Sequence, residues 1–191
     1  MEKYLAFDVE TGGLDPNKAS LLTAYFAVLD ENFDAIDELS LEIKNNSEND
    51  QYHVSAKALE LNRIDLVQLQ KNGISVDNAK LKLIDLIMKH SEDGKFRLMP
   101  LGHNVNFDIG FVQAHLIPKE IWDKYVSYRL ADTASFGIFL QRVKKVIPPN
   151  VRGDLKSLAK HFGIDVEKGD LHTAKFDTVV AVLLLQAMKN A

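Results

Sequence analysis

The sequence predicts a single α/β domain built on a mixed β-sheet, because β-prone segments come first and helical segments then alternate with strands. Three short segments near the start are rich in β-forming residues and are separated by turn residues. After them the apolar spacing becomes mostly helical. Residues 1–191 contain no repeat, low-complexity tract or linker, so we expect one domain.

The first strands can be assigned from their composition. Residues 4–7 form an almost wholly apolar run that ends at Asp8, which is typical of a central strand buried on both faces. A glycine turn follows at residues 12–16. Residues 20–29 and 35–43 are separated by a short polar segment, which predicts a hairpin. We therefore expect the first three strands to form an antiparallel meander.

The rest of the chain is expected to alternate helices with two further strands. Helical spacing predicts helices at residues 55–69, 75–90, 106–115, 132–143, 155–162 and 173–189. Strands are predicted at residues 96–101 and 126–131. The last helix is heavily apolar, so we expect it to pack flat against the sheet. Asp132 is expected to cap the helix that it begins, and Trp122 and Tyr125 to belong to the core.

The composition excludes several classes of protein and site. Apolar residues make up 46% of the chain and charged residues 26%, as in ordinary soluble proteins. The absence of cysteine excludes disulfides, zinc–thiolate sites and thiol nucleophiles. No apolar run approaches the roughly 20 residues needed to cross a bilayer, and the initial run is too short for a signal peptide. We therefore expect a soluble, cytoplasmic protein with no membrane partner.

Charge is distributed unevenly along the chain. The net charge is −4, although proteins that bind nucleic acid are usually basic. Residues 30–50 contain eight acidic residues opposed by Lys44. Residues 141–160 contain six basic residues opposed by Asp154, and such a stripe can contact backbone phosphates. The alternative for both stretches is a solvated face. The basic residues are Arg142, Lys144, Lys145, Arg152, Lys156 and Lys160.

Two carboxylates follow the first predicted strand. Because side chains of a strand alternate, Asp8 and Glu10 are expected to emerge on the same face. Neighbouring carboxylates repel each other unless a proton or a cation neutralises them. Oxygen ligands without cysteine or histidine are those that Mg²⁺ and Mn²⁺ prefer. The pair is therefore a candidate site for a divalent metal ion.

Three blocks in a fixed order distinguish this pattern from chance. Residues 8–16 (DVETGGLDP) follow a predicted buried strand. Residues 102–108 (GHNVNFD) follow another strand and open a helix, and residues 172–177 (HTAKFD) open the last helix. A single spacing carries little information, because a second Asp-x-Glu occurs at residues 165–167. We interpret that copy as a surface turn.

At these three blocks the sequence resembles the DEDDh, or DnaQ-like, 3′→5′ exonucleases. This family includes bacterial polymerase proofreading subunits, ribonuclease T and oligoribonuclease. The blocks occur in the order of the family and extend over nearly the whole chain. The resemblance implies a ribonuclease-H-like fold, with a five-stranded mixed sheet flanked by helices and the first strand at its centre.

The resemblance also implies a catalytic set of five residues. Asp8, Glu10 and Asp177 would ligate two Mg²⁺ ions directly, with Asp8 bridging them, and Mn²⁺ would be expected to substitute. Asp108 would hold the second ion, partly through water. His172 would be the general base. Two cations about 4 Å apart can clamp a phosphate, activate water and stabilise the leaving oxygen, which would release nucleoside 5′-monophosphates.

Substrate contacts follow from the same resemblance. Thr11, Gly12 and Leu14 would meet the terminal nucleotide, with Leu14 against its base. His103 and Asn104 would line the same cleft. Two departures leave the subfamily open: Thr11 is followed by Gly12 where the family often has a second hydroxyl residue, and residues 18–24 lack the usual Arg and Glu.

The main hypothesis from the sequence is a metal-dependent 3′→5′ exonuclease acting on single-stranded ends, with DNA favoured slightly over RNA. One alternative keeps this chemistry and makes the substrate RNA 3′ ends. Another, of a different class, is a nucleic-acid-binding or polymerase-docking module without catalysis. A homodimer, or a polymerase or repair partner, remains open, because the sequence contains no interface signal.

Overall fold

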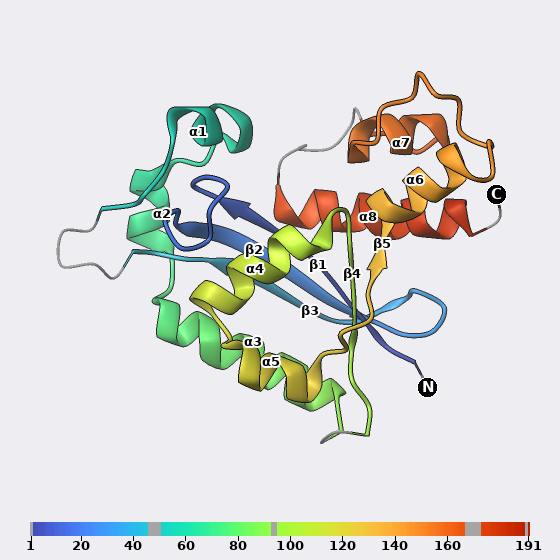
Figure 1. Ribbon diagram of the computed structural model, residues 1–191. Coiled ribbons are helices and arrows are strands. Elements are labelled where there is room, and N and C mark those ends of the chain that lie inside the picture. Colours follow the sequence, from blue (N-terminus) through green and yellow to red (C-terminus); the bar gives the residue numbers. More distant parts are fainter. Residues whose placement is uncertain (1, 46–50, 93–94, 167–172, 190) are drawn as a thin grey trace.

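In the computed structural model the chain forms a five-stranded sheet flanked by helices (Figure 1). The structure describes residues 2–45, 51–92, 95–166, 173–189 and 191. The strands are β1 (Tyr4–Thr11), β2 (Leu21–Leu29), β3 (Ala35–Glu42), β4 (Met99–Gly102) and β5 (Ala131–Asp132). The helices are α1 (Ala56–Asn62), α2 (Leu66–Asn72), α3 (Val76–His90), α4 (Val105–His115), α5 (Lys119–Tyr125), α6 (Thr133–Arg142), α7 (Leu155–His161) and α8 (Ala174–Met188).

The sheet has the predicted mixed topology. Its strand order is β3-β2-β1-β4-β5, so β1 lies at the centre. The pairs β1–β2 and β2–β3 are antiparallel, which confirms the meander. The pairs β1–β4 and β4–β5 are parallel. Parallel β4 brings its carboxyl end to the same edge of the sheet as that of β1, where Asp8 and Glu10 lie.

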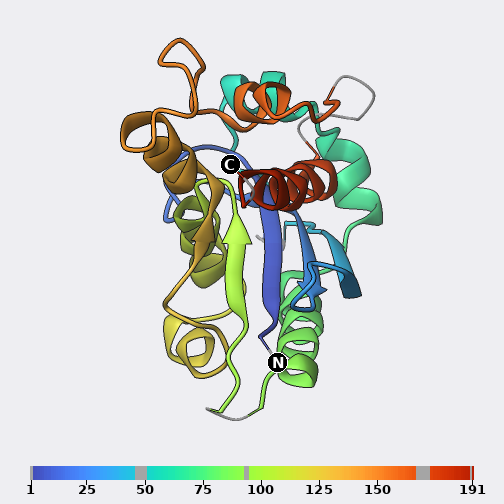
Figure 2. The same ribbon diagram turned by 90° about the vertical axis from the view of Figure 1, so that its right-hand side faces the viewer.

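The side chains of β1 alternate between two cores. Leu5, Phe7 and Val9 belong to the larger core, which includes buried residues of α3, α4 and α5. Ala6 lies on the opposite face in a smaller core with Ala174 of α8. Helix α8 packs against β1, β2 and β4, as predicted for the last helix, and Figure 2 shows it nearly end-on in front of β1. Asp8 and Glu10 therefore face α8.

The predicted helix at residues 55–69 is wrong in its extent, because two helices occupy this stretch. Helix α1 ends at Arg63, whose backbone is left-handed with φ 55°. Asp65 then caps α2 by accepting hydrogen bonds from the amides of Val67 and Gln68. The apolar spacing continues across the break, but a local side-chain cap competes successfully with the continuous helix.

The predicted strand at residues 126–131 is also wrong in its extent. Only Ala131 and Asp132 pair as β5, while Val126 makes an isolated bridge to Leu98. The seven-residue helix α5, which the sequence did not predict, precedes it. Trp122 in α5 is buried and packs edge-on against Phe7, with ring centroids 5.9 Å apart. The assignment of Trp122 to the core is confirmed.

The remaining elements follow the prediction closely. Asp132 caps α6 as expected, because its carboxylate accepts hydrogen bonds from the amides of Ala134 and Ser135. Thr173 caps α8 by accepting a hydrogen bond from the amide of Phe176. Among the described residues, no helix has the length and apolar character needed to span a bilayer.

Candidate active site

Three carboxylates meet where β1 faces α8. Asp8, Glu10 and Asp177 each present an oxygen atom, and these three atoms lie within 4.8 Å of one another. The first two residues follow the two-residue period of a strand and the third lies on the first turn of α8. The structure thus brings together three of the four predicted metal ligands.

The close approach of α8 to the sheet depends on small side chains beneath it. Ala6 of β1, Ala27 of β2 and Ala174 of α8 are all buried in the same small core. Because alanine keeps the helix and the sheet near each other, Asp177 reaches the carboxylates of β1. A larger residue at these positions would separate the ligands.

Asp108 lies on the first turn of α4 and is almost fully buried, with 3% of its surface exposed. Its Oδ1 accepts a hydrogen bond of 3.0 Å from the backbone N–H of Val9, which lies between Asp8 and Glu10. Its charge is close enough to raise the pKa of both Asp8 and Glu10. Asp108 is therefore a neighbour of the cluster, anchored to the strand that carries it.

Burial and mutual repulsion disfavour the charged forms of these carboxyl groups. The pKa of Asp8 is raised well above its usual range by burial and by repulsion from Asp108, Glu10 and Asp177. Burial and the charges of Asp177 and Asp108 raise the pKa of Glu10 to about 8. Burial likewise raises the pKa of Asp108 to about 7. The cluster needs protons or a cation to be stable near neutral pH.

The donor set fits a hard divalent cation. It consists of carboxylate oxygens, which Mg²⁺ and Mn²⁺ prefer, and the three oxygens of the cluster are close enough to share one ion. A cation would also remove the repulsion that raises the pKa values. The identity of the ion and the number of ions stay predictions.

The turn after β1 exposes one apolar side chain. Leu14 is 87% exposed, although it is a large hydrophobic residue. Thr11 donates its hydroxyl to the carbonyl of Gly13 at 2.8 Å. The carbonyl of Thr11 accepts a hydrogen bond from the buried Asn62, a residue that no sequence pattern singles out. The predicted contact of Leu14 with a base is compatible with this exposure and stays a prediction.

Gly12 is required by a close approach of two backbones. A Cβ atom at this position would lie 2.1 Å from the carbonyl oxygen of His53. The N–H of Gly12 donates to Ser20 and its carbonyl accepts from Ser55, both at 2.8 Å. These bonds use the backbone polar groups of Gly12 within the fold. Its predicted contact with a nucleotide is not tested by this arrangement.

His103 and Asn104 follow β4 and contact residues at the start of α6. The Nδ1 atom of His103 lies 2.9 Å from the hydroxyl of Thr133, and burial lowers the pKa of the ring. Asn104 has left-handed backbone, φ 59°, and its N–H donates to Asp132 at 2.6 Å. Both residues lie at the junction of β4 and α4, and their predicted contact with substrate stays open.

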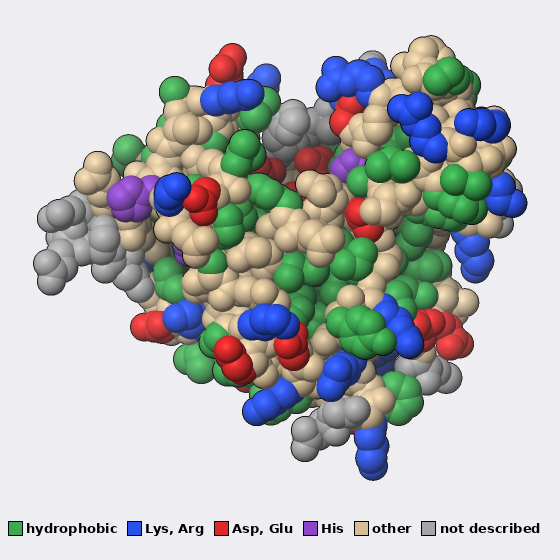
Figure 3. Space-filling model, viewed as in Figure 1, with side chains coloured by type: hydrophobic (Ala, Val, Ile, Leu, Met, Phe, Trp, Pro, Cys, Tyr) green, Lys and Arg blue, Asp and Glu red, His purple; other side chains and the backbone are tan. Residues whose placement is uncertain are grey.

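His172 lies outside the described residues, so its role as general base stays a prediction. Figure 3 shows a hollow between α1 on one side and α6 and α7 on the other, with acidic side chains on its floor. A cavity of about 410 Å³ adjoins the cluster and is lined by Glu10, Asn62, Arg63 and Lys175, among others.

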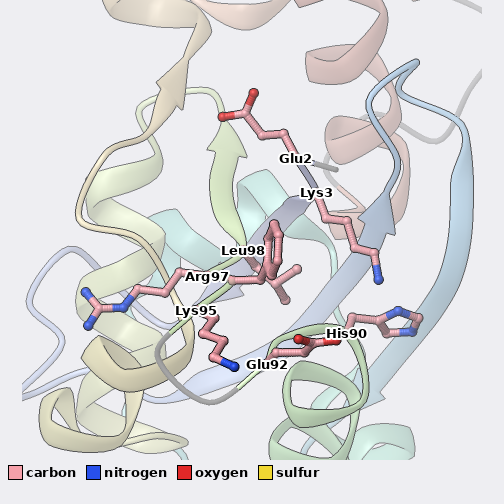
Figure 4. Close-up of a pocket in the computed structure, with 8 residues that line it drawn as sticks. Glu2, Lys3, His90, Glu92, Lys95, Arg97 and Leu98 are labelled. Atoms are coloured by element: carbon pink, nitrogen blue, oxygen red, sulfur yellow. The ribbon is translucent and has the colours of Figure 1, made fainter.

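A second cavity lies away from the carboxylates, before the start of β1. It has a volume of about 470 Å³, and Glu2, Lys3, His90 and Arg97 are among its lining residues (Figure 4). The labelled side chains come from the residues before β1, from the end of α3 and from the segment before β4, and they point in different directions. None of the four predicted carboxylates lines this cavity.

Comparison with known proteins decides the fold. The chain superimposes on E. coli exonuclease I in complex with a dT13 oligonucleotide with a TM-score of 0.77 and 17% identity, over 99% of this chain and 41% of that one. The fold is that of exonuclease I. The zinc-ion-bound form of the E. coli exonuclease I complex with single-stranded DNA gives a TM-score of 0.79 and 18% identity, over 100% of this chain and 41% of that one.

The resemblance to DnaQ-like exonucleases is thus confirmed at the level of the ribonuclease-H-like fold. A curated relative, the PolC-type DNA polymerase III of Ureaplasma parvum, is 22% identical over 188 residues, which are 98% of this chain and 11% of that protein. No protein-family model matches the chain. The chain spans less than half the length of exonuclease I and about a ninth of the polymerase.

Proposed function

We propose that this protein is a metal-dependent 3′→5′ exonuclease that releases nucleoside 5′-monophosphates from single-stranded ends. The observation that carries this proposal is the cluster of Asp8, Glu10 and Asp177 within the fold of exonuclease I. Asp108 is the fourth carboxylate, anchored beside them. A buried group of like charges is costly unless it serves to bind a cation, and a cation at a strand end suits phosphodiester hydrolysis.

The comparisons favour DNA as the substrate. Structural neighbours include exonuclease I with dT13, with dA16 and with a bound product. The relative at the sequence level is named a DNA polymerase. These names belong to other proteins, and we extend them to this chain because its fold matches over its whole length. RNA 3′ ends are the alternative substrate.

The four carboxylates would have different roles in binding the cations. Asp8, Glu10 and Asp177 would hold the divalent cations directly, and Asp108 would support them. Bound there, the cations would supply positive charge to polarise the scissile phosphate, acidify water and stabilise the leaving oxygen. Leu14 would contact the terminal base, since it follows β1 and offers an exposed apolar side chain.

His172 would accept the proton of the attacking water, because a neutral imidazole is a competent base near pH 7. Replacing His172 with Ala is therefore expected to reduce the rate on the order of 10²-fold or more while metal binding persists. The rate comes from strand digestion, and metal binding from the rise in melting temperature on adding Mg²⁺. His161→Ala, at an exposed histidine of α7, is the matched control. Near-normal turnover of His172→Ala would remove the residue from this role.

The experiment that tests the function is digestion of matched single-stranded DNA and RNA, each labelled at the 5′ end, in the presence of Mg²⁺. We expect a ladder that shortens from the 3′ end and disappears with EDTA. The relative rates on the two strands identify the preferred substrate. Faster digestion of RNA would favour the exoribonuclease alternative. No ladder on either strand, even with Mn²⁺, would favour a binding or docking module.

The basic stretch offers a separate prediction about strand binding. Lys144 and Lys145 follow α6, and Lys156 is exposed on α7. Replacing Lys144 and Lys145 with Gln is expected to weaken binding of a single strand and to flatten its dependence on salt, because fewer counterions are released. Titration of a labelled oligonucleotide at several salt concentrations measures both effects. Replacing Lys80 and Lys82 of α3 with Gln is a control with the same change in charge. An unchanged salt slope would identify the stretch as a solvated face.

A further inference from the structure

The loop of residues 12–20 carries Leu14 from the end of β1 to β2. Its base is closed by the hydrogen bond from the N–H of Gly12 to the carbonyl of Ser20, at 2.8 Å. One side is held by the neighbouring segment, because the N–H of Ser20 donates to the carbonyl of His53 at 3.0 Å. The other side meets α4, where Nε2 of His115 lies 2.9 Å from the carbonyl of Pro16. The backbone of Ala19 is a second hydrogen-bond partner of this ring.

A cavity lies beside this loop. It has a volume of about 220 Å³ and is lined by Asn17 and Ser20 of the loop and by Lys44, His53 and His115 opposite them, among others. Ala19 packs against the larger core, and the cavity lies beside it. The position of the loop depends on its hydrogen bonds, and the bond from His115 spans 99 positions of the sequence.

His115 is well suited to hold the loop because its own position is fixed. Its ring stacks on that of Phe111, with centroids 5.8 Å apart and planes 8° apart, and Phe111 is fully buried. One helix face thus contacts the first strand and its loop at two places: Asp108 binds the N–H of Val9, and His115 binds the carbonyl of Pro16. Asp108 and His115 are seven positions apart, as are Val9 of the strand and Pro16 of the loop, so α4 fixes the strand end and the loop together.

We propose that His115 is a positioning residue of the exonuclease, which holds the loop of residues 12–20 so that Leu14 stands at the entrance of the carboxylate site. His115 touches neither the substrate nor the cations. It acts through Leu14, whose exposed side chain meets the terminal base. This inference rests on the proposed function.

The test compares two variants of His115 that differ in one property. His115→Phe keeps the ring and its stacking but has no N–H to donate, whereas His115→Gln keeps a donor. We expect the KM for a single-stranded oligonucleotide to rise about tenfold in His115→Phe with kcat changed less than about twofold, and to return to within about threefold in His115→Gln. His161→Phe is the matched control, since His161 also pairs with a neighbouring phenylalanine, Phe162, but is exposed.

A double-mutant cycle with Leu14→Ala separates positioning from a general loss of structure. If His115 acts through Leu14, His115→Phe adds less than about twofold to the KM in the Leu14→Ala background. Independent, multiplicative effects would overturn the proposal, as would a Gln variant no better than Phe. A wild-type protein without activity would instead overturn the proposed function. In that case, hydrogen exchange still tests the role of His115 in the loop. The amide of Lys18 donates to the carbonyl of Asp15 within the loop. Faster exchange of this amide in His115→Phe would support the loop contact, and unchanged exchange would refute it.

Discussion

Replacing Asp8 with Asn is expected to reduce strand digestion on the order of 10³-fold or more, or about 4 kcal/mol of transition-state stabilisation. Asp8 lies between the other carboxylates, and its charge interacts with those of Asp108, Glu10 and Asp177. The amide keeps the shape of the side chain but removes the negative charge that would bind the cations. The fold should therefore persist while metal binding and catalysis are lost together.

The measurement is the rate of 3′-end digestion at saturating Mg²⁺, with circular dichroism to establish that the variant is folded. Asp165→Asn is the matched control, because Asp165 begins the second Asp-x-Glu of the chain and is exposed. That variant should digest strands at the wild-type rate. If Asp8→Asn retained more than about a tenth of the activity, the carboxylate cluster would not be the active site.

The metal-free protein is expected to lose stability as the pH rises. The pKa of Glu10 is about 8 in the folded chain, against an ordinary value of 4.5, and those of Asp8 and Asp108 are also raised. Between these limits the folded state binds more protons than the unfolded state, so the free energy of unfolding decreases with increasing pH. The Glu10 shift alone corresponds to a loss of about 5 kcal/mol, at 1.36 kcal/mol for each pKa unit.

Melting temperatures measured in EDTA from about pH 5 to about pH 8 test this expectation. Mg²⁺ should oppose this loss of stability, because a bound cation stabilises the ionised carboxylates. The rise in melting temperature on adding Mg²⁺ should therefore increase as the pH increases over this range. Glu10→Gln should raise the melting temperature of the metal-free protein at about pH 8 and reduce the rise in melting temperature that Mg²⁺ produces. Glu120→Gln, on the first turn of α5, is the control substitution. A melting temperature that rises with pH in EDTA would contradict the assignment.

The sheet could be predicted because its signals are local and repeated. The apolar run that precedes Asp8, and the hairpin between residues 29 and 35, needed no distant contact to be recognised. The break after α1 was missed because Arg63 in a left-handed conformation has no compositional signal, and Asp65 as a cap competes with a continuing helical period. The short helix α5 was missed because seven residues contain too few turns to establish a period.

The sequence predicted the carboxylates of the candidate site but not the residues that hold its strand and loop in place. Asp8, Glu10 and Asp177 were chosen from the order of three blocks, and the structure brings them together. Asn62 and His115 carry no motif, because their contacts with Thr11 and Pro16 exist only after distant segments meet. Hydrogen bonds of this kind depend on the packed fold and leave no pattern along the chain.

The cluster joins the first strand of the fold to its last helix, and this has a consequence for how the protein is made. During synthesis β1 emerges before α8, and α8 with Asp177 emerges only after all five strands of the sheet. A growing chain therefore carries Asp8 and Glu10 without their partner. Docking of α8 completes the core and assembles the carboxylates in the same step, so their repulsion opposes that step and a cation favours it. A chain in which α8 has not yet docked would therefore lack the complete carboxylate cluster.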